Sequence, residues 1–117
     1  MEDQEFLKVE EILEHAAKIV ERGWTQNRMA AFGYRDVDPV DPKAEAWCAL
    51  GSIERAVYEL SEGKLHPTKD ADGVSMAHVA TASVRDLLPG TSLSWFNDRS
   101  GRTQEEISQL LRKAAHS

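Results

Sequence analysis

The residues with the greatest chemical potential lie in one short polar stretch that runs from Trp95 to Thr103. This stretch combines an aromatic ring with the amide of Asn97, the carboxylate of Asp98 and the guanidinium of Arg102. It leads into a predicted helix start, where free backbone N–H groups favour anions. Such a combination could bind a small polar ligand or a loop of another protein. The same residue types are also typical of an Asx turn that bonds its own backbone, with the arginine paired to a carboxylate.

Binding is a better interpretation of this stretch than catalysis. Asp98 is the one credible general base, but a carboxylate needs a raised pKa or a metal for that work near neutral pH, and neighbouring arginines favour its ionised form. The sequence contains no nucleotide-binding loop, zinc-protease pair or serine elbow. We therefore predict a protein that is not an enzyme. The candidate residues for a ligand or a partner are Trp24, Arg55, Trp95, Asn97, Asp98 and Arg102.

Metal and cofactor sites are not predicted. Asp36, Asp38 and Asp41 alternate along the chain, but a calcium loop would need a glycine at its sixth position and a distant glutamate. No histidines or cysteines have the spacing of metal ligands. The single cysteine, Cys48, falls on the apolar face of a predicted helix, so we expect a small buried thiol.

Length and charge place the chain among small acidic globular proteins. Its 117 residues amount to one domain, residues 1–117, and 20 acidic against 14 basic residues give a formal charge of −6. Nucleic-acid binding is disfavoured, because phosphate contacts need clustered lysine and arginine. An acidic surface suits a basic partner or serves solubility alone. The acidic N-terminus and the lack of a long apolar run predict a cytoplasmic protein without a membrane segment.

The hydrophobic pattern predicts an all-α fold, a compact bundle of four main helices plus one short helix. The central helix is expected over Asp41–Glu62, with Asp41-Pro42 as its start and Glu62-Gly63 as its end. Its broad apolar face implies neighbours on several sides, and we expect the Trp-Asn-Asp stretch to be fastened against it. The Thr91–Phe96 segment reads as a short extended piece or turn. The other expected helices are Asp3–Arg22, a short one over Thr25–Ala31, Val74–Leu88, and Thr103–Ala115 with a capping box.

Several blocks of the sequence resemble an uncharacterised family of small helical proteins found in bacteria, especially actinobacteria, and in their phages. The resemblance spans roughly residues 20–115. In this chain Phe96 separates the tryptophan from the Asn-Asp pair. The resemblance carries no established activity; it implies that the blocks converge on a shared polar site or a shared buried scaffold. The matching blocks are Gly23–Gln26, Trp47–Ala56, Leu93–Asp98 and Gly101–Thr103.

These observations lead to two functional hypotheses from different classes. The first is a non-enzymatic protein that binds another protein, with a phage or mobile-element inhibitor of a host defence nuclease as one concrete version. The alternative is a binder of a small anionic ligand or nucleotide, held by Trp24, Arg55, Trp95, Asp98 and Arg102. Sequence-specific DNA binding through residues 74–115 ranks behind both because of the charge balance.

Overall fold

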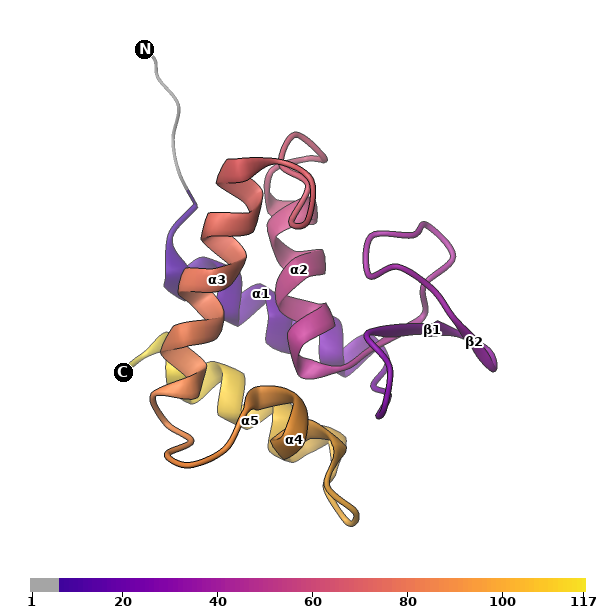
Figure 1. Cartoon of the computed structure of the whole chain (residues 1–117), viewed down its shortest axis with the longest axis vertical. Coiled ribbons are helices and arrows are strands. Elements are labelled where there is room, and N and C mark those ends of the chain that lie inside the picture. The colour runs from indigo at the N-terminus through magenta and orange to yellow at the C-terminus, as the bar shows by residue number, and fades with distance from the viewer. Residues whose placement is uncertain (1–6) are drawn as a thin grey trace.

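The computed structural model describes residues 7–117 and shows a mostly helical protein with a small sheet. Figure 1 shows α2 and α3 running side by side, with α4 and α5 near one end of this pair. The predicted helical bundle is thus confirmed in its main part, but a purely all-α fold is wrong. In the described part the elements are α1 (Val9–Arg22), β1 (Ala30–Phe32), β2 (Arg35–Asp36), β3 (Ala46–Trp47), α2 (Ala49–Leu60), α3 (Ala71–Arg85), α4 (Leu93–Asp98) and α5 (Gln104–Ala115).

The hydrophobic core lies where α1 and α2 meet the other helices. α1 packs against α5, α2 and α3, and α2 packs against α1, α3, α4 and β3. The central helix is therefore enclosed by its neighbours, as its broad apolar face predicted. Among the described residues, the large apolar side chains with no exposed surface are Ile12, Leu13, Ile19, Val20, Ile53, Val57, Val84, Ile107 and Leu111.

The central helix begins eight residues later than the predicted start at residue 41, at Ala49. Its N-cap is Cys48, whose Sγ accepts a hydrogen bond from Gly51 N at 3.3 Å. Asp41 instead caps a turn, because its Oδ1 accepts from Lys43 N at 2.8 Å. The chain cannot be helical just before Cys48, since the backbone of Trp47 is paired in the sheet and donates to Gly23 O at 3.1 Å.

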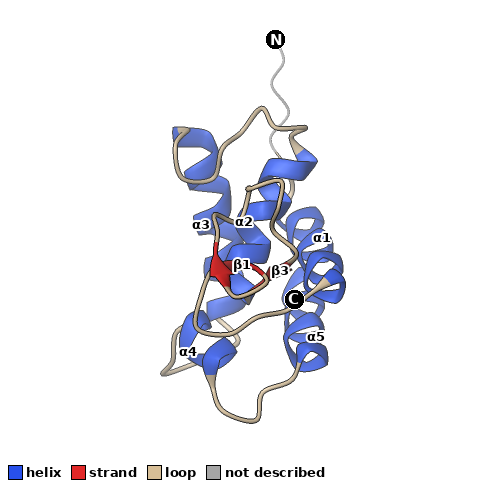
Figure 2. Ribbon diagram, turned by 90° about the vertical axis from the view of Figure 1, so that its right-hand side faces the viewer, coloured by secondary structure: helices blue, strands red, loops and turns tan. Residues whose placement is uncertain are grey.

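The helix predicted over Thr25–Ala31 is wrong, because this segment leads into a strand. β1 pairs antiparallel with β2 and with β3, giving the order β2-β1-β3. A two-residue loop, Gly33-Tyr34, joins β1 to β2, and Gly33 has a φ of +61°, which favours glycine. The sheet lies on one side of the helices, at the right in Figure 1 and in front of α2 in Figure 2.

Two glycines let the sheet segment approach the helices closely. A Cβ on Gly51 of α2 would lie 2.0 Å from Met29 O, and one on Gly23 would lie 2.1 Å from Glu45 O. Gly23 does follow the last residue of α1, as predicted, but its φ of 178° is extended backbone. Close approach, rather than a left-handed helix end, explains the glycine at this position.

The remaining helices differ from prediction mainly at their ends. Of the predicted Asp3–Arg22 helix, residues 3–6 lie outside the described residues, and α1 begins at Val9. α3 begins and ends about three residues earlier than predicted. The extended piece or turn predicted over Thr91–Phe96 is wrong from Leu93 onward, because α4 is helical there and is capped by Ser92, whose Oγ accepts from Trp95 N at 3.1 Å. The capping box of α5 is confirmed.

None of the described helices combines the length and the apolar character that a membrane-crossing helix requires.

Candidate functional site

A buried amide joins three separate parts of the chain. Asn97 has no exposed surface, and its Oδ1 accepts hydrogen bonds from Trp24 Nε1 at 2.8 Å and from Ala49 N at 2.9 Å. Its Nδ2 donates to Thr25 O at 3.1 Å and to Asp98 Oδ1 at 2.9 Å. Ala49 is the first residue of α2, whose N–H has no partner within its own helix. Asn97 therefore fastens α4 to the start of α2, as predicted for the Trp-Asn-Asp stretch, whereas Trp95 of that stretch is 70% exposed.

The neighbouring side chains extend this connection to the loop before β1. Asp98 Oδ1 accepts from Asn27 N at 2.8 Å, and Asn27 has a φ of +66°. Gln26 Nε2 donates to the carbonyl oxygens of Asn97 and Arg99, each at 3.0 Å. We call the group Trp24, Gln26, Asn97 and Asp98 the α4 latch.

In this structure the α4 latch connects α4 to the start of α2 and to the loop before β1, and it is not an open binding site. All four hydrogen-bonding sites of the Asn97 amide are occupied within the chain, so this side chain has none left for a ligand. The structure thus brings Trp24, Asn97 and Asp98 together in a structural role. This role is not the Asx turn that the sequence offered as an alternative to binding, because the backbone partners Thr25, Asn27 and Ala49 lie far away in the sequence.

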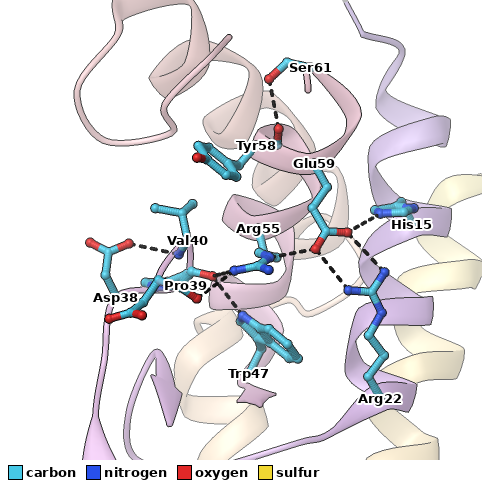
Figure 3. A network of polar contacts seen from close by, with 11 residues as sticks. His15, Arg22, Asp38, Pro39, Val40, Trp47, Arg55, Tyr58, Glu59 and Ser61 are labelled. Carbon is cyan, nitrogen blue, oxygen red and sulfur yellow. Dashed lines mark hydrogen bonds and ion pairs between the residues drawn. The ribbon is translucent and has the colours of Figure 1, made fainter. Parts of the chain in front are cut away.

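Arg55 lies in a different cluster, between α1 and α2. Its Nε pairs with Glu59 Oε2 at 2.7 Å, and one of its terminal nitrogens donates to Pro39 O at 3.1 Å and to Asp41 O at 2.9 Å. Its guanidinium carbon also lies 5.4 Å from the centre of the Trp47 ring. Arg55 therefore holds the loop before β3 against α2 (Figure 3), and none of its bonds within the described residues reaches the α4 latch.

Glu59 is the centre of this second cluster. Besides Arg55, it bonds His15 at 2.9 Å and receives two hydrogen bonds from Arg22, at 3.0 and 3.1 Å. Partial burial alone would raise the pKa of Glu59, but the hydrogen bonds from these three side chains outweigh it and lower that pKa to about 2. The cluster is an ion-pair network that ties α1 to α2.

Arg102 is also engaged within the chain. Its Nε donates to Phe96 O at 2.9 Å, and its guanidinium carbon lies 3.5 Å from the centre of the Phe96 ring. A terminal nitrogen also lies 3.4 Å from Glu106, which is in the first turn of α5. Because Thr103 and Glu106 cap the start of α5 with their own side chains, Arg102 and this helix start are not an open anion site.

Trp95 is the one predicted site residue whose side chain faces solvent. It is 70% exposed and lies between two adjoining hollows, of about 370 and 570 Å³. Phe96 and Arg102 line the smaller hollow, and Asn27 and Asp98 line the larger one. The group that lines both hollows is Ser92, Trp95 and Arg99, which we call the Trp95 surface.

Sequence reasoning missed Arg99 and Asn27 as residues that border Trp95. Arg99 follows α4 and is exposed, and its carbonyl is held by Gln26 while its side chain remains outside the latch. If residues 93–98 had been predicted as a helix, Arg99 would have been expected near Trp95, because residues four apart share a helix face. Asn27 is brought there only by the long-range bond to Asp98, which has no local signal.

Metal ligation finds no support in the described residues, where no three histidine, cysteine or carboxylate side chains are grouped to hold an ion. Cys48 is buried, as predicted, and burial raises the pKa of its thiol to about 11. The thiol is therefore protonated near neutral pH, which does not suit a nucleophile.

Fold and surface together define a class: a mostly helical protein with a small antiparallel sheet and an exposed aromatic residue on a latched helix. The chain belongs to a family of unknown function (DUF6197), whose model matches residues 6–117. This agrees with the resemblance seen in the sequence blocks. Neither a curated protein nor a solved structure shows significant similarity to the chain.

Proposed function

We propose that this protein acts by binding another protein through the Trp95 surface, without catalysing a reaction. The observation that carries this proposal is an indole that is 70% exposed on a helix fixed in place by a buried, fully bonded amide. Tryptophan and arginine are the residues that contribute most to protein–protein affinity. Because the α4 latch already orders this helix, binding would not require the backbone to become ordered first, which favours affinity.

The acidic face of α1 also supports binding to another protein, but less than the Trp95 surface does. Glu14 and Glu21 are paired with Arg112 of α5, at 2.7 and 2.8 Å, so these carboxylates serve the helix–helix contact. Glu10 and Glu11 remain exposed in the first turn of α1. A basic partner would therefore meet a smaller acidic surface than the sequence suggested.

The proposal is tested by capture and cross-linking. A photoreactive amino acid at position 95 of the full chain should cross-link to a discrete partner in a lysate of cells in which the protein acts. The matched control carries the same group at Val79, which is also exposed, at 51%, but lies on α3. The Trp95→Ala variant should lose the partner, while Val79→Ala should retain it.

Equal capture by Trp95→Ala and the unchanged chain would overturn the Trp95 surface as the binding site. In that case the double variant Glu10→Lys, Glu11→Lys tests the acidic face of α1, without disturbing the α1–α5 ion pairs of Glu14. Identification of the captured protein also tests the version in which this chain inhibits a host defence nuclease. That version expects the partner to be a nuclease or part of its complex.

A small anionic ligand is the second candidate, because Trp95 and Arg99 border the same hollow of about 570 Å³. An indole can stack on a base, and an exposed guanidinium can pair with a phosphate. Thermal shift with a panel of nucleotides and cyclic nucleotides tests this candidate. A rise in melting temperature that disappears in Arg99→Gln would favour it over a protein partner.

A further inference from the structure

Another hollow lies on a different part of the molecule, between α2 and α3. It has a volume of about 450 Å³, within the usual range for small-molecule sites, and it is separate from the residues of the Trp95 surface. Leu50, Pro67, Val74 and Ala77 supply an apolar lining. We call this hollow the α2–α3 groove; its polar lining residues are Glu54, Thr68, His78, Thr81 and Arg85.

Two oppositely charged side chains line the groove without forming an ion pair with each other. Glu54 is on α2 and Arg85 is in the last turn of α3, and no ion pair within 4.0 Å joins them in the described part of the chain. Glu54 is half-buried, and burial, with a smaller contribution from Asp38, raises its pKa to about 7. A desolvated carboxylate is costly unless it is paired, so this side chain gains from a cationic partner.

Thr81 is a polar lining residue of the groove whose hydroxyl is not hydrogen-bonded within the described residues. It lines the groove on α3, and its Oγ1 is a buried side-chain atom without a hydrogen-bond partner in residues 7–117. Buried polar atoms are bonded in the large majority of cases, so an exception calls for a partner. Because less than 1 Å² of this atom is exposed, a ligand in the groove would bond it only after the Thr81 side chain rotates.

We propose that the α2–α3 groove binds a small zwitterion, with an ammonium group at Glu54, a carboxylate at Arg85 and a short apolar body between them. The apolar lining accommodates the body, and the two opposite charges held apart match the two ends of such a ligand. A purely cationic ligand would meet the unfavourable charge of Arg85, and a purely anionic one would meet that of Glu54. This site is independent of the function proposed for the Trp95 surface.

The experiment uses ω-amino acids as probes, because they present both charges at a chosen separation. The full chain is titrated with 4-aminobutanoate, 6-aminohexanoate and 8-aminooctanoate, and backbone amide shifts are followed by NMR. We expect one of them to bind saturably, with the largest shifts at Glu54, Ala77 and Thr81. The best probe is then compared with the alkylamine and the carboxylate of the same carbon number, each of which lacks one charge.

Two variants separate the roles of the two charges. Glu54→Gln should weaken the zwitterion and the amine about tenfold while leaving the carboxylate within twofold, as expected for the loss of a charged hydrogen bond. Arg85→Gln should weaken the zwitterion and the carboxylate about threefold, since Arg85 is exposed and its charge is screened. Glu10→Gln removes a charge from an exposed carboxylate on α1 and should change none of these affinities.

Titration of Glu54 gives a measurement that ligand binding should change and that a purely structural role of Glu54 would leave unchanged. The bound zwitterion should lower the pKa of this carboxyl, measured by carbon NMR, and binding should strengthen as the pH rises from about 6 to 8. The charged groups around Glu54 are Asp38 from the loop before β3 and His78 and Arg85 from α3. The proposal is overturned if no probe binds saturably in the groove, or if both variants weaken the three probe types equally.

Discussion

Replacing Asn97 with alanine should be among the most destabilising single changes in this protein. The substitution removes four hydrogen bonds at a side chain with no exposed surface. It leaves Ala49 N buried without a partner and deprives Trp24 Nε1 and Thr25 O of theirs. Each such group costs about 1–3 kcal/mol, so we expect a loss of about 3–5 kcal/mol in the free energy of unfolding.

The measurement is urea unfolding of Asn97→Ala and the unchanged chain, followed by tryptophan fluorescence and by circular dichroism. For a chain of this length the expected loss corresponds to a fall in melting temperature of about 12–20 °C. Gln109→Ala is the matched control, because it truncates an amide whose bond to Glu105 is exposed, and it should stay within about 0.5 kcal/mol of the unchanged chain.

A double-mutant cycle shows whether the loss comes from the latch. Trp24→Phe removes the indole donor while leaving Asn97 Oδ1 bonded to Ala49 N, so it should cost about 1 kcal/mol for the lost bond, plus the smaller ring. In the Asn97→Ala background the same change should cost less, because the bond is already absent. A loss below about 1 kcal/mol in Asn97→Ala, or strict additivity of the two changes, would refute the reasoning.

Four further outcomes are expected. Gly51→Ala should destabilise the fold by several kcal/mol (about 3 or more), because its Cβ would meet Met29 O at 2.0 Å; the free energy of unfolding measures this. Glu59→Gln should lower the free energy of unfolding by about 1–2 kcal/mol near pH 7. Because the pKa of Glu59 is lowered to about 2, this difference between the variant and the unchanged chain should disappear as the pH falls from about 5 to 2 in acid unfolding. Glu54 has a raised pKa of about 7, so the unchanged chain should lose stability as the pH rises from about 4.5 to 7, and Glu54→Gln should be the more stable protein at pH 8 but not at pH 4. Trp95→Ala should change the melting temperature by no more than about 2 °C, since its side chain is 70% exposed.

The sequence predicted best those features that depend on neighbours in the chain. The capping box of Thr103 and Glu106 is formed, and Gly63 takes a φ of +80° just beyond the end of α2, because both signals act within a few residues. The apolar faces of α1 and α2 were also recognisable, since helical spacing alone places Ile53 and Val57 on one side.

The sheet could not be predicted, because its cause is not local. Ala30 and Ala31 have no strand preference of their own; their conformation is set by pairing with Trp47 and Ala46, about sixteen residues away. The same pairing prevents the central helix from starting at Asp41, although an aspartate followed by a proline is a typical helix start. Tertiary contacts overrode a locally reasonable signal in both cases.

The candidate site shows the same division between local and long-range causes. The stretch around Trp95 was recognised by its composition, but the partners of Asn97 come from residues 24, 25 and 49, which no spacing rule connects to it. Arg55 was grouped with this stretch by residue type alone, whereas the structure pairs it with Glu59 on the next turn of its own helix.

The position of Trp95 follows from that of Asn97. Residues two apart on a helix are rotated by about 200°, so they point to nearly opposite sides. Burying Asn97 at the start of α2 therefore turns Trp95 toward solvent, and the same bonds that make the amide unavailable to a ligand hold the indole in one orientation. If the exposure of Trp95 serves binding, loosening the latch must weaken partner capture even when residue 95 is unchanged. Trp24→Phe, which should remain folded, offers this comparison. Amide hydrogen exchange measures how far α4 has loosened in this variant. If partner capture falls in proportion to that loosening, the latch contributes to function. Undiminished capture with faster exchange in α4 would show that the latch serves stability alone.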